Sequence, residues 1–68
     1  MKIKLNGEPR DLDSAVRLSE LIRHELNGKE AKGVAVAVNT KVVPKQSWET
    51  IILNENDSVE IVNAVQGG

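Results

Sequence analysis

Only one stretch of this 68-residue chain has the apolar spacing of a helix. Apolar residues in that stretch recur at intervals of three or four and so share one helical face: Ala15, Leu18, Leu21, Ile22 and Leu26. The residues expected on the opposite face are polar or charged: Arg17, Glu20, Arg23, His24 and Glu25. A short chain with a single amphipathic helix needs a sheet to cover that helix, which points to an α+β fold.

The ends of this helix carry recognisable signals. Asp13 or Ser14 can serve as the N-cap, and a later start near Leu18 is the alternative. Asn27 and Gly28 predict the C-terminal end, with Gly28 suited to the left-handed cap position.

The residues before the helix predict a β-hairpin. Residues 2–5 alternate polar and apolar, as a half-buried strand does. Asn6-Gly7 is a strong signal for a tight turn, because both residues tolerate a positive φ. The return strand, residues 8–12, contains Pro9, which lacks an N–H and so favours a sheet edge.

Further strands are expected after the helix. Residues 34–38 are apolar throughout, which is typical of an interior strand covered on at least one side. Residues 42–43 start a short strand that Pro44 interrupts.

The next segment is expected to be less regular. Residues 46–50 predict a corner with Trp48 folded onto the sheet edge; we favour a core anchor over a partner contact for this lone tryptophan. Residues 51–53 form a short extended run, and residues 54–57 form a turn in which Asn56 suits a positive φ.

The last strand is expected over residues 58–65. Its alternation puts Val59 and Ile61 on one face and Glu60 and Val62 on the other. The order is therefore ββαββ, which predicts a β-grasp fold: a mixed sheet of about four to five strands packed on one helix. We expect a single domain over residues 1–68, with 66–68 as a flexible functional tail.

Composition excludes several classes of protein. The formal net charge is −1 with acids and bases interspersed, which argues against a nucleic-acid surface. No apolar run approaches membrane length. The chain contains no cysteine, which excludes a disulfide framework and a cysteine metal site and fits a cytoplasmic protein.

The chain ends in Gly67 and Gly68, and this pair is the candidate functional group. Residues without a Cβ form a thin, flexible thread that can enter a narrow enzyme channel. The α-carboxylate of Gly68 is then the reactive group. The alternative is a frayed end without function.

Other candidate groups have a simpler interpretation. His24 is the only histidine and lies on the polar side of the helix, where a solvated residue is expected. Four acids lack a histidine or a paired carboxylate and are interpreted as ordinary surface or turn residues: Glu20, Glu25, Asp57 and Glu60. Asn6-Gly7 is a turn rather than a phosphate loop, because no strand-to-helix glycine-rich sequence follows it.

The chain resembles the ThiS family of sulfur carriers of bacterial thiamin biosynthesis. The resemblance rests on the opening KIKLNG, then LSELI, VAVAVN, VVP, Trp48, Leu53, VEIV and the closing Gly-Gly, which together cover nearly the whole chain. It departs from the family pattern at Lys45-Gln46, where the family usually has an arginine and a small or acidic residue. It also departs at Asn56, which replaces a usual glycine.

The resemblance implies a chemistry at Gly68. A ThiF-type enzyme would adenylate the carboxylate with ATP, and sulfur from a donor such as a cysteine desulfurase would convert it to a thiocarboxylate. A ThiG-type thiazole synthase would then take the sulfur. The carrier would bind no cofactor or metal and would itself be no enzyme. It would be a monomer alone, with Gln66 and Gly67 threading into the partner.

The partner-binding face is predicted from the alternation of the last strand. If Ile3, Leu5, Val59 and Ile61 face the helix, then the opposite residues form an open face: Lys2, Lys4, Glu60, Val62 and Ala64. We expect Val62, Ala64 and Val65 to help seat the activating enzyme. The alternative is that these residues only complete the sheet.

Three other functions remain open at this stage. The small subunit of molybdopterin synthase has the same kind of terminus but a different sulfur acceptor. A ubiquitin-like modifier would use the activated carboxylate to form an isopeptide bond. The third alternative is a β-grasp binding module with an inert tail.

Overall fold

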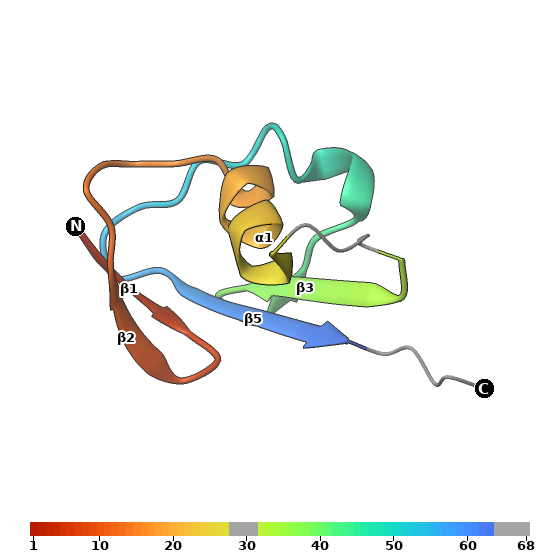
Figure 1. The fold of residues 1–68 in the computed structure, drawn as a ribbon, viewed down its shortest axis with the longest axis horizontal. Coiled ribbons are helices and arrows are strands. Elements are labelled where there is room, and N and C mark those ends of the chain that lie inside the picture. The colour runs from red at the N-terminus through yellow and green to blue at the C-terminus, as the bar shows by residue number, and fades with distance from the viewer. Residues whose placement is uncertain (28–31, 64–68) are drawn as a thin grey trace.

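The structure, a computed structural model, describes residues 1–27 and 32–63. Two strands, one helix and three more strands follow one another along the chain (Figure 1). Their bounds are β1 Lys2–Leu5, β2 Glu8–Asp11, α1 Leu18–Leu26, β3 Val34–Val38, β4 Lys41–Val42 and β5 Ser58–Asn63, with a 3₁₀ turn at Lys45–Ser47. The predicted hairpin and helix are found in this order, but three strands follow the helix instead of the two in the predicted ββαββ order.

The strands form one mixed sheet in the order β2-β1-β5-β3-β4. β1 and β5 run parallel, and the other neighbours are antiparallel. The helix packs across one face of this sheet (Figure 1). β2 is an edge strand, where Pro9 lies opposite Lys4, so the edge position predicted for Pro9 is confirmed.

The helix begins at Leu18, with Arg17 as N-cap, so the N-cap predicted at Asp13 or Ser14 is wrong and the later start is right. The reason is a backbone pairing that the local pattern does not reveal. Leu18 N–H donates to Ile51 O at 2.8 Å, and Leu53 N–H donates to Val16 O at 2.9 Å. Because Arg17 is extended and bridges to Ile52 between these two hydrogen bonds, the helix cannot start earlier.

Because the helix starts later, the set of residues predicted to face the core also changes. Ala15, predicted on the apolar stripe, lies outside the helix and is exposed. Val16, which the stripe omitted, is half-buried and packs against the core.

The helix ends at a left-handed residue, as expected, but that residue is Asn27, with φ 54° and ψ 46°. Its N–H donates to the carbonyls of Arg23 and His24. Asparagine tolerates this conformation better than most residues. Gly28, to which we assigned the left-handed position, lies outside the described residues.

The core between helix and sheet is aliphatic apart from Trp48. Its members are Ile3, Leu5, Leu18, Leu21, Ile22, Val36, Val43, Trp48, Leu53 and Val59. The indole of Trp48 is 5% exposed, and its Nε1–H donates to the carbonyl of Val43 at 3.0 Å. Trp48 is therefore a core anchor, as predicted, with its one polar atom satisfied.

Candidate functional site

β5 carries the chain towards the predicted site. It runs through the middle of the sheet and ends on the side of the molecule opposite the N-terminus (Figure 1). The predicted alternation is confirmed over the described part of the strand: Val59 is buried, Ile61 is half-buried, and Glu60 and Val62 are exposed. The remaining predicted site residues lie outside the described residues: Ala64, Val65, Gln66, Gly67 and Gly68.

The start of β5 is fixed by a side chain from the turn between β3 and β4. Asn39, with φ 51°, accepts the N–H of Ser58 at its Oδ1 at 2.9 Å. Its Nδ2 donates to Asp57 Oδ1 at 2.9 Å, and the other oxygen of Asp57 accepts the N–H of Asn54 at 2.8 Å. Asp57 is thus a turn residue with structural partners, as expected.

The face of the sheet away from the helix carries a small apolar patch. In the register of the sheet Val62 lies opposite Ala35, and Ala37 lies opposite both Glu60 and Val42. Val62 is 55% exposed and Val42 is 76% exposed. We call Ala35, Ala37, Val42 and Val62 the open-face patch.

Sequence reasoning found only one member of the open-face patch, Val62. Val42 was missed, although the neighbouring Val43 points into the core and alternation then turns Val42 outwards. Lys2 and Lys4, predicted on the open face, are exposed, and Lys2 Nζ lies 4.0 Å from Asp11 Oδ1.

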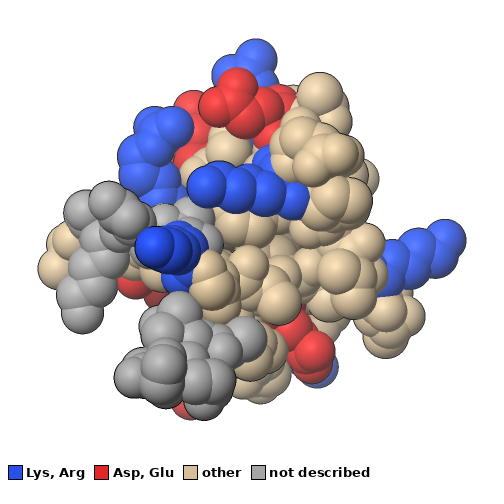
Figure 2. Space-filling view, turned by 90° about the vertical axis from the view of Figure 1, so that its right-hand side faces the viewer, with Lys and Arg blue, Asp and Glu red and all other residues tan. Residues whose placement is uncertain are grey.

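The charges at the end of the molecule where β5 stops are dispersed. Figure 2 shows this side: lysine and arginine side chains project as separate arms, with uncharged surface between them. No continuous basic surface is visible there, in agreement with the net charge of −1.

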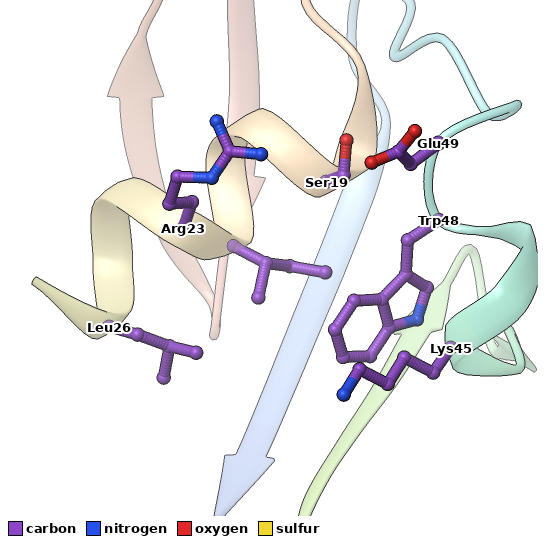
Figure 3. A pocket seen from close by; sticks show the side chains of 7 residues that line it. Ser19, Arg23, Leu26, Lys45, Trp48 and Glu49 are labelled. Atoms are coloured by element: carbon purple, nitrogen blue, oxygen red, sulfur yellow. The ribbon is translucent and has the colours of Figure 1, made fainter. Parts of the chain in front are cut away.

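A shallow groove of about 270 Å³ lies between the C-terminal half of α1 and the 3₁₀ turn (Figure 3). Its walls include Ile22, Leu26 and Trp48, with Arg23 and Lys45 at the sides. Lys45 lies alongside the indole, and Arg23 projects from the helix across from it (Figure 3).

The groove lacks the groups of a hydrolytic site. Among the described residues that line it, Ser19 is the only one with a hydroxyl group, Glu49 is the only acid, and none is a histidine that could activate the serine. Across residues 1–27 and 32–63, no group of three or more potential ligands is arranged to hold a metal ion.

Among the described residues, the shortest charged contact joins the hairpin to the helix. Arg10 on β2 pairs with Glu25 on α1 through both guanidinium nitrogens. The hydrogen bond from Arg10 and its charge hold the pKa of Glu25 below its ordinary value, and the same pair raises the pKa of Arg10. Glu25 is therefore half-buried and paired, although we expected a simple surface acid.

His24 has no catalytic surroundings. Its side chain is 83% exposed, and its Nδ1 lies 3.7 Å from Glu25 Oε2. The expected solvated histidine is confirmed. In the part of the chain that the structure describes, no helix is long and apolar enough to cross a membrane.

Comparison with known proteins gives one consistent result. The sequence model of the ThiS family matches residues 3–68. The sulfur carrier protein ThiS of Thermus thermophilus is 41% identical over 64 residues, covering 94% of this chain and 95% of that protein. The ThiS of Escherichia coli K12 is 26% identical, with both chains covered in full.

The fold agrees with this result. The crystal structure of the thiamine biosynthesis protein ThiS from Geobacter metallireducens superposes with a TM-score of 0.81, at 26% identity and with full coverage of both chains. The predicted β-grasp fold is therefore confirmed.

Longer proteins also contain a related segment. The thiazole synthase of Paramagnetospirillum magneticum is 37% identical to this chain over 68 residues. The match covers the whole of this chain but only 20% of that protein, so the chain spans one fifth of the length of this relative.

Proposed function

Because the chain belongs to the ThiS family, we propose that it carries sulfur for the thiazole of thiamin on the carboxyl group of Gly68. Its relatives in Escherichia coli and Thermus thermophilus are sulfur carrier proteins, which are not enzymes. The chain is on this proposal a protein substrate, and its partners supply the catalysis. The single observation that carries the proposal is a family match that extends to residue 68 and so includes Gly67 and Gly68.

The chemistry follows from the weakness of a carboxylate as an electrophile. A ThiF-type enzyme uses ATP to join AMP to the Gly68 carboxylate, releasing pyrophosphate and making a good leaving group. Sulfur from a persulfide donor, such as a cysteine desulfurase, then displaces AMP. Reductive cleavage of the S–S bond to the donor by a thiol leaves a thiocarboxylate.

The enzyme that accepts the sulfur is proposed from the proteins to which this chain is similar. A ThiG-type thiazole synthase takes the sulfur from Gly68. The support is that thiazole synthases from two bacteria contain a segment that matches this chain over its whole length. This observation favours the thiazole of thiamin over molybdopterin as the destination of the sulfur, and a sulfur carrier over a protein modifier.

We also propose that one part of the molecule binds the partner and another part carries the reacting group. The open-face patch, with Val62 beside the tail, seats the activating enzyme, and Ala64 and Val65 continue this contact towards the terminus. The support is that Val42 and Val62 leave apolar surface exposed on the sheet face opposite the helix. Gln66 and Gly67 thread into the partner, where the lack of a side chain at Gly67 allows close approach.

The adenylation step can be tested by itself. The full-length chain is incubated with the cognate ThiF-type enzyme, ATP and labelled pyrophosphate, without a sulfur source. We expect exchange of label into ATP with the full-length chain, and none with a chain that lacks Gly67 and Gly68. Equal exchange with the shortened chain would show that the reacting carboxylate is not the one proposed.

A further inference from the structure

A carboxylate lies directly beside the open-face patch. In the register of the sheet, Glu60 on β5 lies opposite Ala37 on β3, and Val62 follows two positions later on the same face of β5. Val42 lies on the far side of Ala37. Glu60, Val42 and Val62 are all exposed. A partner that covers the patch therefore also covers the side chain of Glu60.

On the β1 side of β5, no strand residue lies opposite Glu60. β1 pairs with β5 only as far as Leu5↔Val59. The next residue, Asn6, has φ 52° and turns the chain, and its side chain bonds to the backbone of Ile61. The N–H of Ile61 donates to Asn6 Oδ1 at 2.8 Å, and Asn6 Nδ2 donates to the carbonyl of Ile61 at 3.3 Å. The nearest strand neighbour of Glu60 is thus the small side chain of Ala37 on β3.

Within the described part of the chain, the carboxylate of Glu60 has neither an ion pair nor a hydrogen bond. Several other acids there accept a hydrogen bond or lie close to a cation: Asp11, Glu20, Glu25, Glu55 and Asp57. Lys4 lies on the same face as Glu60, opposite Ser58, and the two side chains form no ion pair. The charge of Glu60 is therefore compensated by water alone among these residues.

Docking of a partner on the patch removes that water. A carboxylate that loses its hydration against an apolar surface, without gaining an opposite charge, strongly opposes binding. A cation on the partner compensates this loss. Arginine is well suited, because its planar guanidinium donates two parallel hydrogen bonds to a carboxylate.

We propose that Glu60 pairs with an arginine or lysine side chain of the activating enzyme, and that this pair selects which apolar surface the open-face patch accepts. This inference rests on the function proposed above and specifies the chemistry of the partner surface: apolar opposite the patch, with a positive charge opposite Glu60. The apolar residues supply contact area, and the charge pair supplies orientation and discrimination between partners.

The chain offers a matched control at Glu49. Glu49 is also exposed, and its carboxylate likewise has no ion pair or hydrogen bond among the described residues. It lies beside the groove between α1 and the 3₁₀ turn, away from the open face of the sheet (Figure 3). Glu60→Gln and Glu49→Gln therefore change the net charge equally and keep the shape of the side chain, and only the first lies beside the patch.

The first measurement is the Kd of the full-length chain for the cognate ThiF-type enzyme, by isothermal titration calorimetry without ATP. We expect Glu60→Gln to raise Kd about tenfold and Glu60→Lys to raise it at least about a hundredfold, because the cation of the enzyme loses its partner or meets a like charge. Glu49→Gln and Glu49→Lys should stay within about twofold of wild type. Circular dichroism checks that all four variants are folded.

Two results of the titration would overturn the proposal. An unchanged Kd for Glu60→Gln would show that Glu60 meets no cation and only keeps the exposed patch soluble. An equal rise for Glu49→Gln would show an effect of the carrier's net charge instead of a local pair.

The second measurement is a charge swap on the enzyme. Enzyme variants, each with one surface arginine or lysine replaced by glutamate, are titrated with wild-type carrier and with Glu60→Lys. We expect one enzyme variant to bind Glu60→Lys at least about tenfold more tightly than the unmodified enzyme does, and to bind wild-type carrier more weakly. If no variant shows this reversal, the direct pair is refuted.

The outcomes separate this inference from the function on which it rests. Normal adenylation of the wild-type chain with an unchanged Kd for Glu60→Gln would overturn the charge pair and leave the carrier function standing. A wild-type chain that binds the enzyme and is not adenylated would refute the carrier function, whereas the titrations would still decide whether Glu60 meets a cation.

Discussion

At the scale of single residues, the one aromatic side chain shows how a small aliphatic core gains a defined shape. Trp48 lines the groove between α1 and the 3₁₀ turn (Figure 3), and its N–H donates to the carbonyl of Val43. A hydrogen bond in a buried place contributes little by itself, but its loss leaves a carbonyl unpaired and away from water.

We therefore expect substitutions of Trp48 to lower the free energy of unfolding, and the loss to grow with the part of the side chain that is removed. Trp48→Phe should lower the free energy of unfolding by about 2 kcal/mol, because the carbonyl of Val43 loses its donor and the ring is smaller. Trp48→Ala should cost about 3–5 kcal/mol and leave little folded protein. Urea unfolding followed by far-UV circular dichroism measures both; a loss below about 0.5 kcal/mol for Trp48→Phe would contradict this account.

The pair of Arg10 and Glu25 predicts a dependence of stability on pH. The pKa of Glu25 is lower in the folded protein than in the unfolded chain, so its contribution is present at neutral pH and is lost as the pH falls through the folded value. The groups nearby are His24, which is exposed, and Glu8, which faces Arg10.

Glu25→Gln tests this dependence. At pH 7 the variant should be less stable by less than about 1 kcal/mol, because Arg10 is partly exposed to solvent. The difference from wild type should vanish in acid, once the carboxyl of Glu25 is protonated. Thermal unfolding of both proteins from neutral to acidic pH measures this, and a difference that is constant with pH would contradict it.

Predictions for single residues were correct where the conformation depends on residues close by in the sequence. The positive φ at Asn56 was predicted because asparagine in a turn favours it, and the structure has φ 71° there. The bonds from Asn6 to Ile61 were not predicted, because they join residues far apart in the chain and no local pattern marks them.

At the scale of elements, the helix was predicted from its stripe, but its start was decided by tertiary structure. The pairing of residues 16–18 with 51–53 moves the start to Leu18, and a pattern read along one segment cannot reveal a partner on another. A left-handed residue at the end of the helix was predicted, because asparagine and glycine are the residues that most readily accept this conformation. The structure has it at Asn27.

Asn27→Ala tests the importance of this helix end. Alanine in the left-handed conformation costs about 1 kcal/mol more than asparagine, so the free energy of unfolding should fall by about that amount. Asn27→Gly should be as stable as wild type or slightly more so. Chemical denaturation of the three proteins compares them, and an alanine variant as stable as the glycine variant would contradict the assigned conformation.

The residues of the open-face patch lie on β3, β4 and β5, and Val62→Asp tests the patch. A charge on the patch must be desolvated on docking, so we expect KM for adenylation to rise at least tenfold. The matched control is Ile52→Asp, another exposed aliphatic residue, which pairs with Arg17 outside the five-stranded sheet. Both proteins should remain folded, because both positions are exposed. Unchanged adenylation kinetics in folded Val62→Asp would remove the patch from the docking surface.

At the scale of the whole molecule, the fold separates two tasks. The helix and the inner face of the sheet form the core, which leaves the outer face available for partners and places the end of β5 away from the N-terminus (Figure 1). No described cluster of side chains resembles a hydrolytic or metal site. The chain belongs to the ThiS family, and its relatives in Escherichia coli and Thermus thermophilus are sulfur carrier proteins.

Most of the fold was predictable because one helix and short strands leave few ways to bury an aliphatic core. The candidate site was predictable only in part. Alternation along β5 placed Val62 outwards, whereas the contribution of Val42 depends on β4 joining the sheet beside β3, which is a tertiary pairing. Gly67 and Gly68 were singled out because they lack a Cβ, their chemistry was inferred from the resemblance, and the predictions for residues 64–68 remain to be tested.

Intact mass spectrometry tests the central claim most directly. The full-length chain is incubated with the cognate ThiF-type enzyme, ATP and a sulfur source, alongside a chain that lacks Gly67 and Gly68. The account predicts that the full-length chain alone gains the mass difference of one oxygen replaced by sulfur, and that a ThiG-type synthase then removes this gain. A folded full-length chain that forms neither adenylate nor thiocarboxylate with an active partner would contradict the account.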